Sequence, residues 1–187
     1  MTMQDETLEN VDLSQADRAG EVFDNCTFKN CKLLESNLED ARFESCVFQD
    51  CSLINTQISG ARLQDVTFER CQLVGLDFSS CSKALLSVKF KETRLTLANF
   101  TGLKLNGTSF AGCELNECDF IGATLVKCSF RKASLARTQF QKCDLTEADF
   151  RDATGYAFNP WDNKLKRARF SHPEVLALLE PLGIVVD

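Results

Sequence analysis

Large apolar residues recur at every fifth position along most of this chain. They run from Phe23 to Phe78 and, after one seven-residue step, from Leu85 to Phe150. An α-helix turns about 100° per residue and would spread such residues around its axis, whereas a continuous strand would alternate their faces. A coil with four short sides avoids both conflicts, because each pentapeptide forms one side and position i+20 returns above position i. The period therefore predicts a four-sided β-solenoid with these residues pointing inward.

The residues two positions before each inward residue are mostly small, and they include nine of the ten cysteines; only Cys81 lies outside this register. Here Cys alternates freely with Ala, Ser and Thr, as a small buried apolar residue would. We therefore interpret the cysteines as core residues and not as a disulfide framework or metal cluster. Cys31, Cys51 and Cys71 fall in one predicted column, and a redox or metal role for that column stays open as an alternative.

Twenty-residue coils also predict which aromatic rings stack. From Leu85 to Phe150 the inward residues alternate Leu and Phe, which places Phe on two opposite sides of the coil. One predicted column of core rings comprises Phe28, Phe48, Phe68, Phe90, Phe110, Phe130 and Phe150. Burying side chains of this size stabilises the fold by about 1.5–3 kcal/mol each, so we assign these rings a structural role.

The breaks in the period suggest five segments. We expect an N-terminal cap or first coil at 1–20, a solenoid subdomain at 21–78, an offset segment at 79–84, a second solenoid subdomain at 85–154, and an irregular segment, helix and tail at 155–187. Ser171 and Glu174 have the spacing of a capping box, with Pro173 in the first turn of the expected helix. Its apolar stripe and the following tail give the candidate cap and dimer contacts Val175, Leu178, Leu179, Leu182 and Ile184.

The repeat resembles that of the pentapeptide repeat family, in which a small residue, Asp or Asn, and Leu or Phe precede two variable residues. Ala98-Asn99-Phe100-Thr101-Gly102 and Ala148-Asp149-Phe150-Arg151-Asp152 match this pattern. The resemblance implies an all-β fold, a right-handed quadrilateral β-helix, with a C-terminal capping helix. The offset and the C-terminal helix with its Leu-Gly-Ile-Val tail are similar to those of the quinolone-resistance and microcin-immunity subgroup.

That subgroup implies a function. Its members are rod-shaped dimers joined through their C-terminal regions, and they act on type II topoisomerases, above all DNA gyrase, as mimics of DNA. The resemblance therefore implies a homodimer that binds gyrase or a related enzyme and confers resistance or immunity to a topoisomerase poison. Some members carry projecting loops that quinolone protection needs, and this chain has none within its two regular runs. Gyrase inhibition or immunity to another poison is thus an equal alternative.

Charge supports an acidic contact surface at the N-terminal end. The chain has a formal net charge of −6, yet residues 1–78 hold 15 acidic and 6 basic side chains, and residues 79–187 hold 12 and 15. A basic groove attracts such an acidic surface. The candidate contact residues are Asp17, Asp24, Glu39, Asp40, Glu44 and Asp77. Ordinary solvation of these carboxylates is the alternative for each of them.

Other functional classes find little support in the sequence. The single histidine, His172, lies at the expected helix start, and no nucleophile–base set, phosphate loop or Cys/His metal spacing occurs. We expect a non-enzymatic protein with no cofactor, no metal, no small-molecule substrate and no direct nucleic-acid contact. No signal peptide or membrane span is evident, so we expect a cytoplasmic location. A scaffold for a protein other than a topoisomerase remains the alternative function.

Overall fold

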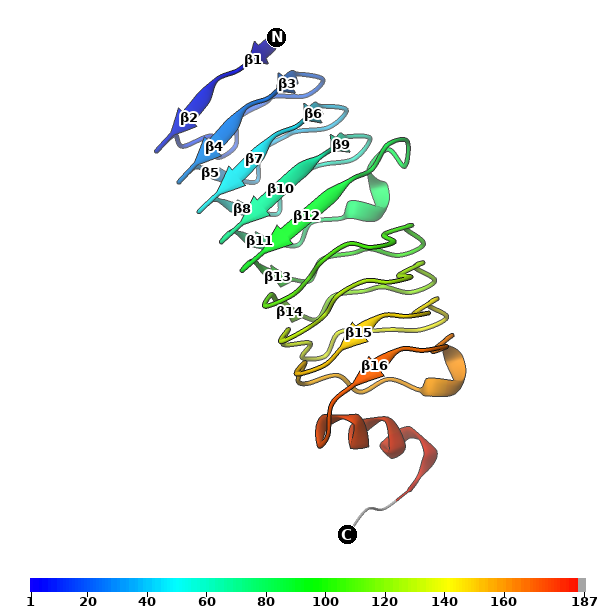
Figure 1. Cartoon of the computed structure of the whole chain (residues 1–187). Helices are drawn as coiled ribbons and strands as arrows, with labels where there is room; N and C mark the ends of the chain where they lie inside the picture. The colour runs from blue at the N-terminus through cyan, green and yellow to red at the C-terminus, as the bar shows by residue number, and fades with distance from the viewer. Residues whose placement is uncertain (185–187) are drawn as a thin grey trace.

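The structure, a computed structural model, describes residues 1–184 as a rod of stacked four-sided coils (Figure 1). The N-terminus lies at one end of the rod and the C-terminus at the other. The fold is an all-parallel, right-handed β-solenoid, as the five-residue period predicts. No helix among the described residues is long and apolar enough to cross a membrane.

Short parallel strands line three of the four faces. Face 1 carries β1 (Thr2–Gln4), β3 (Val22–Asp24), β6 (Arg42–Glu44) and β9 (Arg62–Gln64). Face 2 carries β2 (Thr7–Glu9), β4 (Thr27–Lys29), β7 (Val47–Gln49), β10 (Val66–Glu69) and β12 (Val88–Lys91), and further along β15 (Asp149–Phe150) and β16 (Arg169–Phe170). Face 3 carries β5 (Lys32–Leu34), β8 (Ser52–Ile54), β11 (Gln72–Val74), β13 (Arg94–Thr96) and β14 (Glu114–Asn116).

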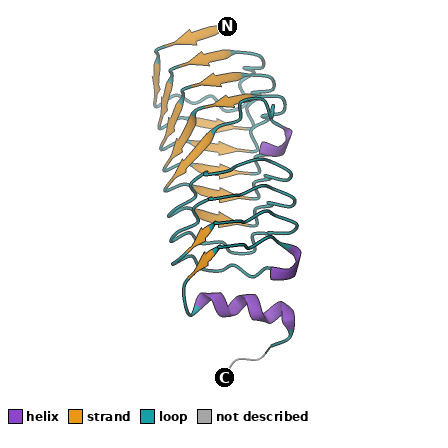
Figure 2. Ribbon diagram, turned by 45° about the vertical axis from the view of Figure 1, so that its right-hand side comes forward, coloured by secondary structure: helices purple, strands orange, loops and turns teal. Residues whose placement is uncertain are grey.

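Face 4 is held by isolated bridges instead of strands. These bridges join Asp17 to Asn37, Asn37 to Gln57, Asp77 to Asn99, Asn99 to Asp119 and Asp119 to Gln139. Two short 3-10 helices, η1 (Phe78–Ser80) and η2 (Pro160–Asp162), interrupt this face. A third 3-10 helix, η3 (Glu174–Leu182), lies across the C-terminal end of the stack (Figure 2).

The predicted Phe column is confirmed and runs nearly the length of the rod. All seven predicted members are buried, with exposures of 3% or less. Their rings stack in order with centroids 4.5 to 5.6 Å apart, and Phe170 continues the stack at 5.2 Å from Phe150. Phe100, on the opposite side of the coil, meets Phe90 edge to face at 5.9 Å. The two Phe columns therefore interlock across the core.

The corner residue of nearly every pentapeptide has a left-handed backbone. Residue 25 and its equivalents at five-residue spacing have φ near +50° to +70°. Gly, Asn and Asp tolerate this conformation best, which explains their frequency at the corners, for example Asn25, Asp40 and Gly60. Leu97 occupies the same conformation, at φ 54°, with its side chain 55% exposed.

The side chains at the offset are not placed as the sequence predicts. Leu85 was expected to point inward, but its side chain is 73% exposed; Leu86 packs against the core instead. The backbone hydrogen bonds show why. The N–H of Ser82 donates to the carbonyl of Ala61, and the N–H of Ser87 donates to the carbonyl of Leu63. The extra residues of the offset therefore bulge outward between these two bonds. Sheets of faces 2 and 3 cross the offset, with Phe68 opposite Phe90. The two expected solenoid segments therefore share one core.

Cys81 also follows the common register after all. It is buried and its thiol donates to the carbonyl of Ile58, 23 positions earlier, as Cys46, Cys51 and Cys71 do with Phe23, Phe28 and Phe48. The exception inferred from sequence was wrong because the offset inserts its residues after Cys81, not before it. All ten cysteines thus occupy inward small-residue positions and are unpaired as disulfides.

The solenoid continues beyond residue 154, where the sequence period lapses. The backbones of Lys164 and Arg169 form parallel β-pairs with those of Asp144 and Asp149, and the ring of Phe170 stacks on that of Phe150. The helix that follows is confirmed, but its expected capping box is wrong. The Ser171 hydroxyl instead accepts the N–H of Asp152 at 2.9 Å, and η3 has no side-chain cap. Ser171 is thus used to attach the last coil to its predecessor.

Candidate protein-binding surface

The six acidic candidates lie on two adjoining faces of the first four coils. Asp24 and Glu44 are cross-strand partners on face 1, one coil apart. Glu39 lies on face 4, and Asp40 forms the corner between them, with its carboxylate beside Gly60. All are exposed except Asp24, which is partly buried. The structure therefore brings Asp24, Glu39, Asp40 and Glu44 to one edge of the rod.

Asp17 and Asp77 lie on face 4 but are engaged by local structure. Asp17 accepts hydrogen bonds from the Ala19 N–H at 3.2 Å and from the Asn37 amide at 3.0 Å. Asp77 caps η1 by accepting the Ser79 N–H at 3.0 Å. Both carboxylates stay exposed. They shape the corner turns as well as adding negative charge.

Two arginines interrupt the acidic edge, and the sequence analysis did not predict this interruption. Arg42 and Arg62 are cross-strand partners on face 1, in the strands that carry Glu44 and Gln64. The twenty-residue spacing of the two arginines could have revealed this column. The negative surface is therefore concentrated towards the first coils of the rod.

The basic residues beside the offset are neutralised by neighbouring coils. Lys89 pairs with Asp65 at 3.4 Å, Lys91 with Glu69 at 3.9 Å, and Arg94 with Glu114 at 3.0 Å. Similar cross-coil pairs join Arg137 to Glu117 and Lys127 to Glu147. Exposed pairs of this kind stabilise a fold by only about 0–1 kcal/mol each. Their main consequence is that this part of the surface presents alternating charges.

Several surface carboxylates are held in their ionised form. The guanidinium of Arg70 donates to Asp50 at 2.8 Å and lowers the pKa of that carboxyl group. Hydrogen bonds from Ser14 lower the pKa of Asp12, and those from Arg151 lower the pKa of Asp149. These groups carry full negative charge at neutral pH.

The cysteines have the environment of core residues. Burial raises the pKa of Cys46 to about 11 and that of Cys128 to about 12, and a reactive thiol needs the opposite shift. In the column of Cys31, Cys51 and Cys71, each thiol donates to a backbone carbonyl. No cluster of three metal-binding side chains occurs within residues 1–184.

Some apolar residues of the C-terminal end cover the last coil, and others are exposed on the surface. Leu178 is buried against the core and Val175 packs beside it; Leu179 and Leu182 are half-buried and Ile184 is 50% exposed. Leu178 and Val175 thus serve the cap, while Ile184 stays free for a contact; Val185 and Val186 lie outside the described residues. Tyr156 is buried against Phe150 and Phe170, whereas Trp161 is 82% exposed. His172 is exposed at the start of this end.

Comparison with known proteins identifies the repeat. The pentapeptide repeat region description matches residues 1–78, 21–100 and 41–120, and a description of eight pentapeptide repeats matches residues 113–152. No curated protein matches the sequence.

Solved structures of QnrB1, a plasmid-mediated fluoroquinolone resistance protein, share the fold. One trypsin-treated variant is 18% identical with a TM-score of 0.70 and full coverage of both chains. A second is 20% identical with a TM-score of 0.69, covering 100% of this chain and 92% of its own. Full-length QnrB1 is 16% identical with a TM-score of 0.62, at 98% and 100% coverage. These structures share the fold, and the matched repeats, which span more than half of the chain, show that the chain belongs to the pentapeptide repeat family.

Proposed function

We propose that this protein binds a type II topoisomerase, with DNA gyrase as the first candidate, by presenting its acidic N-terminal coils where the enzyme binds DNA. Binding would confer resistance or immunity to a topoisomerase poison. The fold likeness to QnrB1 over the whole chain supports the choice of partner. The action is proposed as binding, without catalysis, in the cytoplasm.

The charge density of the first three coils is the observation that carries this proposal. Residues 1–60 hold 12 acidic and 4 basic side chains, a formal net charge of −8. Three coils at about 4.8 Å each rise about 15 Å. Double-stranded DNA carries one charge per about 1.7 Å, or about nine over the same length. The first three coils therefore match the linear charge of DNA closely.

A supercoiling assay tests the proposal. Purified protein is titrated into gyrase at two salt concentrations, with and without a gyrase poison. We expect inhibition or rescue from the poison that weakens as salt rises, because the attraction is electrostatic. No effect at either salt concentration would contradict topoisomerase binding.

A matched pair of variants makes this assay specific. Asp24→Asn, Glu39→Gln and Glu44→Gln together remove three charges from the acidic edge. Glu114→Gln, Glu117→Gln and Glu147→Gln remove three from the ion-paired part of the surface. Only the first triple variant should lose the effect. Equal loss from both would show that net charge alone matters.

We also propose that two copies join through their C-terminal ends into a longer rod. Ile184, half-exposed beside the cap, supports this. Light scattering should give a dimer mass for the native chain and a monomer for Ile184→Asp. Leu97→Asp is the control, since Leu97 is 55% exposed, against 50% for Ile184, but remote from this end. A monomeric native chain would contradict the proposal.

A scaffold for another protein is the second candidate. The alternating ion pairs of the C-terminal half favour it, because that surface has no acidic excess to match DNA. If gyrase is unaffected, this candidate becomes the stronger one.

A further inference from the structure

Face 4 loses its backbone pairing near the C-terminal end. One coil earlier this face is closed: Phe120 and Gly122 donate to the carbonyls of Gln139 and Gln141 at 3.0 and 2.8 Å, and Gln139 donates to Cys118 at 2.8 Å. The next coil has no counterparts within the described residues. The N–H groups of Phe140 and Lys142 have no backbone acceptor, and the Thr138 carbonyl has no backbone donor. A short stretch of strand edge is therefore left unpaired.

The lapse of the five-residue period causes this opening. Tyr156 and Phe158 are both buried and both aromatic, whereas a regular pentapeptide pairs one large inward residue with a small one two positions earlier. The chain then turns outward into η2. Pairing resumes only at Asn163, whose side chain donates to the carbonyl of Phe140 at 2.9 Å and accepts the Cys143 N–H at 2.9 Å.

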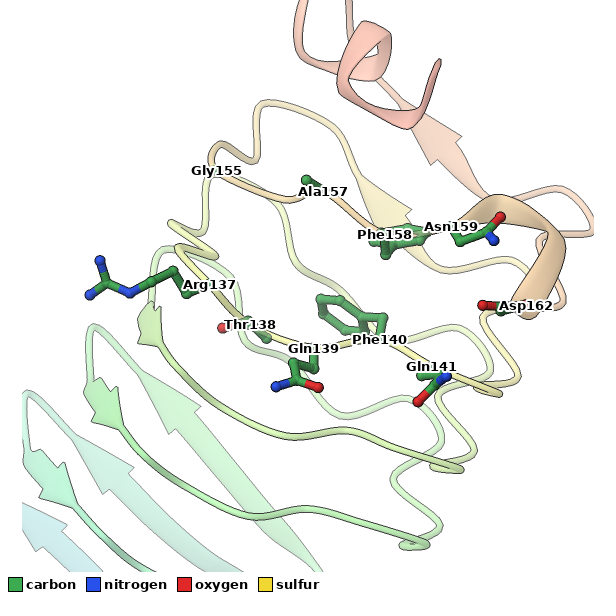
Figure 3. Close-up of a pocket in the computed structure, with 10 residues that line it drawn as sticks. All are labelled: Arg137, Thr138, Gln139, Phe140, Gln141, Gly155, Ala157, Phe158, Asn159 and Asp162. Carbon is green, nitrogen blue, oxygen red and sulfur yellow. The ribbon is translucent and has the colours of Figure 1, made fainter. Parts of the chain in front are cut away.

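A groove of about 560 Å³ occupies the opening (Figure 3). Its two walls are the backbone segments 137–141 and 155–159. Phe140 and Phe158, whose ring centroids are 5.3 Å apart, close it on the core side. Its volume is in the usual range of ligand sites, and Trp161, the only tryptophan of the chain, lies in η2 between two of its lining residues.

We propose that this groove binds an extended segment of a partner protein, which adds to face 4 as a strand beside residues 137–142. A peptide backbone supplies both the acceptors that the N–H groups of Phe140 and Lys142 lack and the donor that the Thr138 carbonyl lacks. Strand addition of this kind is a recurrent mode of peptide recognition. Unpaired backbone groups along a groove favour it over a small polar ligand.

Charge and aromatic exposure define the segment further. At one end of the groove Arg137 is already paired with Glu117 at 2.8 Å. At the other end Asp162 has no ion pair in the described part of the chain. The bound segment therefore carries a basic side chain near Asp162. Trp161, 82% exposed, offers an apolar surface of the kind that dominates binding interfaces.

Hydrogen exchange tests the open edge directly. The amides of Phe140 and Lys142 should exchange at least about a hundredfold faster than those of Phe120 and Gly122, their equivalents one coil earlier, because only the latter are hydrogen bonded. Equal protection of the two pairs would overturn the proposal.

Peptide selection tests the occupant. A random heptapeptide library displayed on phage is selected on the immobilised full chain, and the enriched peptides are titrated while the fluorescence of Trp161 is followed. We expect saturable binding that weakens about tenfold or more when the peptide backbone is N-methylated. Ala157→Phe, which fills the groove, should weaken binding similarly.

The control is Thr101→Phe, on the same face where the pairing is closed. It should bind the peptides as the native chain does. A selection that yields no peptide sensitive to Ala157→Phe would overturn the proposal. These experiments involve no topoisomerase, so their outcome does not depend on whether the proposed function is correct.

Discussion

Phe68 and Phe90 are 22 positions apart, yet their rings stack with centroids 5.6 Å apart and planes within 12°. Phe48 and Phe68, at the regular spacing of 20, stack at 5.1 Å. The two extra residues of the offset therefore leave the aromatic column intact, because the corner at Leu85 bulges into solvent. The rod has one continuous core on which its surface features are mounted.

Truncating a ring in this column should be costly. Phe110→Ala removes a side chain with 0% exposure and two stacked neighbours, and we expect the free energy of unfolding to fall by about 3–5 kcal/mol. Leu85→Ala is the matched control and should change it by less than about 0.5 kcal/mol. Chemical denaturation measures both. A large loss from Leu85→Ala would show that Leu85 points inward.

The thiols should resist modification in the folded protein. All ten side chains are buried, so a thiol reagent at pH 8 should label few of the cysteines before unfolding and all ten afterwards. Mass spectrometry counts the labels. Fast labelling of Cys31, Cys51 or Cys71 in the native chain would instead support a redox role for that column.

Stability should decline in alkaline solution. Unfolded thiols ionise near pH 8.5, whereas burial raises the pKa of Cys46, Cys113 and Cys118 to about 11 and that of Cys81 and Cys128 to about 12. Between about pH 9 and these values the unfolded state binds fewer protons, so a rise in pH favours unfolding.

Cys128→Ala checks that the thiols cause this decline. The pH slope of the free energy of unfolding should be shallower by about one proton in the variant. Alanine fits the site, since Ala123 and Ala133 occupy the same kind of position. An unchanged slope would assign the decline to other groups.

Substitutions at two glycines should distinguish the cost of backbone strain from that of a steric clash. Gly102 and Gly155 have φ of +67° and +72°, but a Cβ at Gly102 meets open space, whereas one at Gly155 lies 3.3 Å from the Ala136 nitrogen. Gly102→Ala should cost about 1 kcal/mol from the left-handed backbone alone, and Gly155→Ala should cost more. Thermal unfolding compares them. Equal losses of stability would mean that the backbone near Gly155 shifts to accommodate the added Cβ at no cost.

The sequence predicted the regular part of the rod well because one five-residue rule governs it. A period in which inward residues, small residues and corners alternate leaves few other folds, and the stacked Phe residues follow from it. The family and the solenoid were accordingly predictable. The acidic candidates could be assigned to faces in the same way.

The irregular parts were less predictable, since several local solutions satisfy the same residues. Spacing alone cannot tell whether Leu85 or Leu86 turns inward at the offset. At the C-terminal end, Tyr156 and Phe158 replace the regular inward positions, so the last coil continues after its sequence signal has ended. Ser171 has the capping-box spacing but binds Asp152, 19 positions earlier, because the stacked coil brings that partner closer.

Competition with DNA tests the proposed function most directly. A fluorescent DNA duplex bound to gyrase is titrated with unlabelled protein, and anisotropy reports its displacement. The DNA-mimic account predicts full displacement by the native chain and by the Glu114, Glu117 and Glu147 triple variant, and displacement at least about tenfold weaker for the Asp24, Glu39 and Glu44 triple variant. Binding of the protein to gyrase with the duplex still attached would contradict it.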